Sequence, residues 1–139
     1  MVEVDIMLQV NAPFENIWNI ISKVDNDPNY WKSIISIKNI SRDRNTVTRK
    51  IHLSNGSKCQ QKITLFPKEG IHIQWTKGPI VGTKDIMIID NGSITIIRIQ
   101  INYNLKVAGD KFASVLEELQ SEAEHVLQLI KKQAECHRY

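Results

Sequence analysis

The chain has 139 residues, of which 42% are hydrophobic and 24% are charged, and its net charge is +3. This length suits one domain with its own core, so we expect residues 1–139 to form a single domain. The composition excludes a disordered chain, and no apolar run is long enough to cross a bilayer. The N-terminus has no signal-peptide pattern, which favours a cytoplasmic protein.

The N-terminal segment predicts a strand followed by a short helix. Residues 2–10 alternate apolar and polar side chains, which is typical of a strand with one buried face. Pro13 fits the first turn of a helix, where its missing N–H costs nothing. Residues 14–21 then place their apolar side chains on one helical face. A turn-rich stretch around residues 25–28 ends this helix.

The region from residue 33 to residue 103 predicts six further strands joined by short turns. Four of these strands alternate apolar and polar positions clearly, over residues 47–53, 59–65, 71–75 and 97–103. Asn55-Gly56 is a strong hairpin signal, because both central turn positions need a positive φ. Residues 86–89 are apolar at both odd and even positions, so the sequence leaves open which face of that strand is buried, or whether both are. Short turns between successive strands indicate an antiparallel meander.

A long amphipathic helix is predicted at the C-terminus. Asp110 suits its N-cap, and the helix can continue to about Glu135. Its apolar stripe consists of Phe112, Val115, Leu116, Leu119, Ala123, Val126, Leu127 and Ile130. This stripe must pack on one face of the sheet. The sequence thus predicts an α+β fold with a curved seven-stranded antiparallel sheet around the helix, and either large side chains or a cavity fill the space between them.

The N-terminal motif resembles a known superfamily. Residues 12–18 read Ala-Pro-Phe-Glu-Asn-Ile-Trp, and Asp25 and residues 28–31 (Pro-Asn-Tyr-Trp) follow. This opening is similar to that of the START/Bet v 1-like (SRPBCC) superfamily, and most of all to its polyketide cyclase/dehydrase and coenzyme-Q-binding branch. The resemblance implies a helix-grip fold with two short helices after the first strand. It also implies a cavity for a hydrophobic or amphipathic molecule between the sheet and the C-terminal helix.

Strand parity selects the residues that would line such a cavity. If the apolar positions of each strand face inward, the polar side chains of the same parity do so as well. The predicted ligand-binding residues are Arg49, Ile51, Gln61, Ile63, Ile73, Trp75, Met87, Ile99, Ile101, Tyr103, Phe112, Leu116 and Leu119.

Arg49 is the least usual member of this set. A buried arginine needs a partner, and Asp85 or an acid of the C-terminal helix could supply one. In that case Arg49, Gln61, Asp85 and Tyr103 would orient a ligand. The alternative, which we favour for Arg49 and Asp85, is that each lies at a strand end and reaches solvent.

Side chains typical of catalysis or metal binding form no pattern in the sequence. His52 and His72 have the parity opposite to their apolar neighbours and should face solvent. Neither the histidines nor Cys59 and Cys136 show metal-ligand spacing, and there is no phosphate-binding loop. We therefore expect neither a metal nor a cofactor.

Three functions remain open. The leading hypothesis is binding or carriage of a lipid-like, quinone-like or polyketide-like molecule, without catalysis. The second is a cyclase/dehydrase-type enzyme, in which Arg49 polarises a carbonyl group and Asp85 or Tyr103 moves a proton. The third is a macromolecule-binding module that uses the exposed face of the sheet or the basic hairpin around Arg42 to Lys50, although the basic residues from Lys38 to Lys50 lack the interleaved aromatic residues typical of nucleic-acid binding. The sequence indicates neither the ligand nor the oligomeric state.

Overall fold

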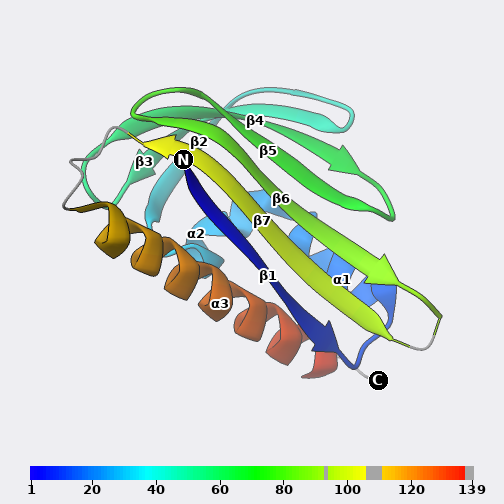
Figure 1. Cartoon of the computed structure of the whole chain (residues 1–139). Coiled ribbons are helices and arrows are strands. Elements are labelled where there is room, and N and C mark those ends of the chain that lie inside the picture. Colours follow the sequence, from blue (N-terminus) through cyan, green and yellow to red (C-terminus); the bar gives the residue numbers. More distant parts are fainter. Residues whose placement is uncertain (93, 106–110, 137–139) are drawn as a thin grey trace.

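The computed structural model describes residues 1–92, 94–105 and 111–136, except for the side chain of Phe112. Within these residues the fold is α+β, with a curved seven-stranded antiparallel sheet and a long C-terminal helix (Figure 1). The strands lie in the order β1-β7-β6-β5-β4-β3-β2, so every neighbouring pair except β1 and β7 is consecutive in the sequence. This is the predicted meander, and pairing of the first strand with the last completes it.

Short connections join the strands from β2 onward, and in the described residues the helices lie between β1 and β2 and after β7. The elements are β1 (Val2–Val10), α1 (Phe14–Ile21), the 3₁₀ helix η1 (Val24–Asn26), α2 (Asp27–Tyr30), β2 (Ile34–Asp43), β3 (Thr46–Leu53), β4 (Lys58–Phe66), β5 (Gly70–Lys77), β6 (Ile80–Asp90), β7 (Thr95–Leu105) and α3 (Phe112–Cys136). The predicted N-cap of α3, Asp110, lies outside the described residues.

The helices pack on one side of the sheet, where Figure 1 shows α3 running beneath it alongside β1. The second half of α3 is the more deeply buried, through Ala123, Val126, Leu127, Ile130 and Ala134. Burying a large aliphatic side chain contributes about 1.5–3 kcal/mol, so this half supplies much of the energy that holds α3 in place.

The inner face of the sheet follows the predicted parity in four strands. Ile51 pairs with Cys59, and Ile63 pairs with Ile73, so these side chains lie side by side in the core. On β7 the inner positions are Ile97, Ile99, Ile101 and Tyr103, all of which are buried.

On β6, the even-numbered residues face the core, which answers the question that the sequence leaves open. Lys84, Ile86 and Ile88 are buried on the inner face, whereas Asp85 and Met87 lie on the outer face. The inward placement predicted for Met87 is therefore wrong. The physical reason is that residues 86–89 are all apolar, so hydrophobicity alone cannot fix the phase of this strand. Asp85 reaches solvent, as we favoured, although it does so from the middle of the strand and not from its end.

None of the helices in the described residues is long and apolar enough to cross a membrane.

Candidate ligand-binding cavity

A cavity of about 610 Å³ lies between the inner face of the sheet and the first half of α3. Its volume is within the range of small-molecule sites. Its wall is mainly apolar, and the residues that supply this apolar surface are Trp31, Ile34, Leu53, Trp75, Ile80, Ile101, Tyr103, Leu105, Val115 and Leu119. The residues thus come from α3, from five strands and from the segment that follows α2.

Two aromatic rings meet at the cavity wall opposite a glycine. Trp75 on β5 and Tyr103 on β7 both pair with Gly82 of β6, and their rings form an edge-to-face contact with centroids 5.8 Å apart. Gly82 has a φ of +139°, and a Cβ atom there would lie 2.0 Å from the backbone oxygen of Asn102. Only glycine fits this position, and its lack of a side chain leaves room for the two rings.

Lys84 is a buried cation in the cavity wall. Only 2% of its surface is exposed, and its Nζ lies 3.5 Å from the ring centroid of Trp31. It makes neither a hydrogen bond nor an ion pair with the residues that the structure describes. Burial lowers the pKa of Lys84 to about 8, and the carboxylates of Asp27 and Glu122 partly oppose this shift.

Glu122 connects α3 to the segment between α2 and β2 at the cavity. Its Oε2 accepts a hydrogen bond from the backbone N–H of Ser33 at 2.7 Å, and its Oε1 accepts one from the Ser33 hydroxyl at 3.0 Å. Both carboxylate oxygens are thus engaged. The contact fixes one side of the cavity and places a negative charge within electrostatic reach of Lys84.

Two residues that line the cavity, Trp75 and Tyr103, carry further hydrogen-bond donors. The buried indole Nε1 of Trp75 has no hydrogen-bond partner among the described residues. Burial raises the pKa of Tyr103 well above its usual value, which the neighbouring Trp75 partly opposes. The Tyr103 hydroxyl therefore stays protonated near neutral pH and can donate a hydrogen bond. The buried polar groups of this mostly apolar wall are thus one ammonium group and two neutral donors. The other polar residues of the lining are exposed or half-buried, namely Lys32, Ser33, Ser54, Asn55, Ser57, Glu118 and Glu122.

The structure places only part of the predicted set at this cavity. Trp75, Ile101, Tyr103 and Leu119 line it. The other predicted residues on the inner sheet face are buried but do not line it, namely Arg49, Ile51, Gln61, Ile63, Ile73 and Ile99. Leu116 is half-buried on α3 and also lies away from the cavity wall. Met87 faces outward, and the side chain of Phe112 lies outside the described part of the chain.

Arg49 is fully buried, so the placement that we favoured for it, at a strand end in solvent, is wrong. Its partner is Asp27 of α2, whose Oδ2 lies 2.5 Å from Nη2, and not Asp85 or an acid of the C-terminal helix. Arg49 also donates to the backbone oxygen of Val24 at 2.8 Å and to Gln61 Oε1 at 2.9 Å. Arg49 thus fastens η1 and α2 to the sheet.

The arrangement predicted for an enzyme is also wrong in its details. Asp85 lies on the outer face, where its Oδ1 is 2.5 Å from Nδ1 of His72. Arg49 is buried in an ion pair with Asp27, and Tyr103 lines the cavity. These three side chains do not converge. The buried titratable side chains that line the cavity are Lys84 and Tyr103.

Sequence reasoning missed Lys84 and Trp31 as cavity residues. Lys84 has the same parity as Ile86 and Ile88, so assigning the other phase to β6 would have placed it inside. Trp31 was marked by the N-terminal motif, but its contact with Lys84 joins the end of α2 to β6, and strand alternation carries no signal for such a contact.

The hairpin formed by β2 and β3 presents less unpaired positive charge at the surface than its sequence suggests. Arg49 points into the core, and Arg42 forms an exposed ion pair with Asp25 at 3.4 Å. Lys38, Arg44 and Lys50 remain exposed. This is a sparse positive surface for binding nucleic acid.

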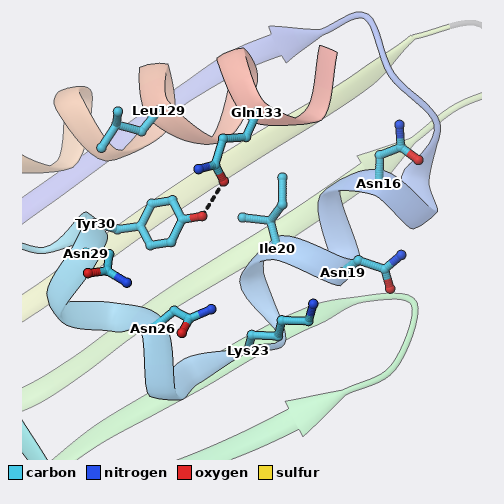
Figure 2. A pocket seen from close by; sticks show the side chains of 9 residues that line it. All are labelled: Asn16, Asn19, Ile20, Lys23, Asn26, Asn29, Tyr30, Leu129 and Gln133. Atoms are coloured by element: carbon cyan, nitrogen blue, oxygen red, sulfur yellow. Dashed lines mark hydrogen bonds between the residues drawn. The ribbon is translucent and has the colours of Figure 1, made fainter. Parts of the chain in front are cut away.

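A second hollow of about 580 Å³ lies among α1, α2 and α3 (Figure 2). Its polar surface consists largely of asparagine amides, and Asn19, Asn26 and Asn29 are among the side chains that line it. The Tyr30 hydroxyl donates to Oε1 of Gln133 across it, as the dashed line in Figure 2 marks. Because its wall offers no buried charge within the described residues, this hollow is a weaker candidate than the cavity beneath the sheet.

The described residues contain no group of three or more histidine, cysteine, aspartate or glutamate side chains that could hold a metal ion.

Solved structures share this fold over nearly the whole chain. A protein from Thermus thermophilus matches with a TM-score of 0.82 and 13% identity, covering 99% of both chains. The Zhui aromatase/cyclase of a Streptomyces species has a TM-score of 0.76 and 12% identity, with 96% of this chain and 93% of that chain covered. A START superfamily protein from Mycobacterium smegmatis has a TM-score of 0.67 and 16% identity, with 96% and 97% covered.

These likenesses show that the chain shares the fold of these proteins, which is the helix-grip fold that the N-terminal motif predicts. No protein-family model and no curated protein matches the sequence.

Proposed function

We propose that this protein binds a hydrophobic or amphipathic small molecule in the cavity between the sheet and α3. The observation that carries the proposal is the cavity itself, about 610 Å³ in volume, with an apolar wall and a few buried polar groups. Such a wall favours an apolar ligand body, while the few polar groups would fix its orientation. The fold shared with a START superfamily protein and an aromatase/cyclase supports the same proposal.

Cavity filling provides a direct test. Leu119 and Leu116 are both half-buried on α3, but only Leu119 lines the cavity. We expect the wild-type protein to bind a fluorescent fatty-acid or quinone probe, and native mass spectrometry after gentle purification to detect a co-purified small molecule. Leu119→Trp should abolish probe binding, whereas Leu116→Trp should retain it. Failure of the wild-type protein to bind any apolar probe would contradict the proposal.

A second candidate is an enzyme of the cyclase/dehydrase type that acts on an aromatic or polyketide-like substrate. The observation in its favour is that Lys84, with a pKa of about 8, and the protonated Tyr103 hydroxyl belong to the same cavity. An amine with such a pKa can exchange protons near neutral pH. Conversion of a bound polyketide-like compound, lost in both Lys84→Met and Tyr103→Phe, would favour the enzyme over the carrier.

A further inference from the structure

We propose that the natural ligand is an amphipathic carboxylic acid and that Lys84 is the counter-ion of its carboxylate. This inference rests on the proposed function, because it names the chemical class of the molecule in the same cavity. Four features of the cavity lead to it.

The first feature is that Lys84 is buried and forms neither a hydrogen bond nor an ion pair with the described residues. Its Nζ contacts the π face of Trp31 at 3.5 Å and forms no ion pair with the described residues. A buried ammonium group is stable only when paired or hydrogen-bonded, and contact with an aromatic ring compensates for part of its lost hydration. An anion in the cavity would supply the missing partner.

The second feature is that the nearest acids are already engaged. Asp27 binds Arg49 Nη2 at 2.5 Å, and both carboxylate oxygens of Glu122 accept hydrogen bonds from Ser33. These two acids influence Lys84 through space but do not contact it. Arg49, the other buried charged residue, is thus paired with Asp27, whereas Lys84 lies at the cavity and forms no ion pair with the described residues.

The third feature is the set of neutral donors beside Lys84. On β6, Lys84 is two residues from Gly82, which pairs with both Trp75 and Tyr103. The Trp75 indole N–H and the Tyr103 hydroxyl therefore belong to neighbouring positions of the same inner face. A carboxylate has two oxygens with several lone pairs, so it could accept from Lys84 and from one of these donors together. Lys84 is the buried cation of this lining, because the other lysine that lines the cavity, Lys32, is exposed.

The fourth feature is the rest of the wall. Ile80, Ile101, Leu105 and Leu119 present aliphatic surface around the polar end. A ligand that pairs with Lys84 would bury an apolar body against these side chains, which is the binding mode expected for an acid with a hydrocarbon or fused-ring body.

The test compares an acid with its uncharged analogue of the same chain length. Dodecanoate and methyl dodecanoate, both kept below the concentration of micelle formation, would be titrated against the wild-type protein and two lysine variants. Lys84→Met removes the buried ammonium group from the cavity, and Lys62→Met is the matched control, since Lys62 is exposed on β4. Lys84→Gln serves as a second variant if Lys84→Met does not fold.

We expect the wild-type protein and Lys62→Met to bind dodecanoate about tenfold or more tightly than methyl dodecanoate. This difference in affinity is the one expected from a hydrogen bond to a charged group. Lys84→Met and Lys84→Gln should bind the acid and the ester equally. Affinity of the wild-type protein for the acid should fall as the pH rises beyond about 8, where Lys84 loses its proton, while affinity for the ester should not change. The charged and titratable groups around Lys84 and the cavity in this experiment are Asp27, Lys32, Arg49, Tyr103, Glu118 and Glu122.

The outcomes separate this inference from the proposed function. If wild type binds acid and ester equally, the carboxylate preference is wrong, while the cavity remains a binding site. If the Lys84 variants keep the preference for the acid, Lys84 is not the counter-ion. If neither compound nor any apolar probe binds to wild type, both the inference and the proposed function fail.

Discussion

Arg49 and Asp27 form the most buried ion pair among the described residues, and they join the sheet to the segment that precedes the cavity. Arg49 is fully buried and also holds the backbone oxygen of Val24. Removing the negative charge of Asp27 would leave the guanidinium without a counter-charge in a site of low polarity. Such a change costs several times more than the loss of a surface ion pair.

We therefore expect Asp27→Asn to lower the free energy of unfolding by about 3 kcal/mol. The matched control is Asp25→Asn, because Asp25 pairs with Arg42 at the exposed surface and should change stability by less than about 1 kcal/mol. Urea denaturation of the two variants measures the difference. Equal effects would mean that burial of the Arg49 pair has no energetic consequence.

Lys84 makes the stability of the protein depend on pH in a defined direction. Its pKa is about 8 in the folded protein, below the usual 10.5 that applies to the unfolded chain. Between these values the unfolded chain keeps a proton that the folded protein has lost, so stability rises with pH. Below pH 8 both states are protonated and the cost of burying the charge is present in full.

Lys84→Met should accordingly be more stable than wild type at pH 7, and its advantage should shrink by about 1.4 kcal/mol per pH unit above pH 8. Urea denaturation of both proteins at pH 7 and at pH 9.5 tests this. Comparing the two proteins cancels the contributions of Tyr103 and Cys59, whose pKa values are raised mainly by burial. A difference in stability that stays constant with pH would contradict the assigned protonation of Lys84.

At the scale of the elements, alternation and turn chemistry predict most of the fold. The hairpin at Asn55-Gly56 and the inner positions of β3, β4, β5 and β7 follow from the sequence, because each of these strands has a clear alternation that marks one face as buried. The phase of β6 could not be predicted, since both of its parities are apolar. The Arg49–Asp27 pair could not be predicted either, since it joins a strand to a turn-rich segment 22 residues away.

The two halves of α3 should respond differently to a buried charge. Leu127 is packed in the core, whereas Leu119 is half-buried at the cavity. Leu127→Asp should therefore destabilise the protein by several kcal/mol, which is comparable to the whole stability of a small domain. Leu119→Asp should cost less, because its carboxylate can reach water through the cavity. Thermal melting of both variants tests this order, and equal melting temperatures would show that α3 is buried uniformly.

At the scale of the whole molecule, the sheet and α3 form one closed core at one end and an unfilled cavity at the other. The closed end is held by the second half of α3 on β1 and α1, where Lys131 donates to the backbone oxygen of Gln9 and the backbone N–H of Asn11 donates to Glu135. The first half of α3 has the cavity beneath it and the Ser33–Glu122 contact beside it. A ligand would therefore complete the core only at this end.

Ligand binding should consequently protect the chain unevenly against hydrogen exchange. We expect slower exchange in residues 115–122 and 33–34, because these segments contribute Val115, Glu118, Leu119, Glu122, Ser33 and Ile34 to the cavity wall. Residues 126–134 should change little, because they are already packed against the sheet and α1. Hydrogen exchange followed by mass spectrometry, with and without dodecanoate, measures both regions in the same sample. Equal protection of both halves of α3 would mean that the ligand stabilises the fold globally and does not fill this cavity.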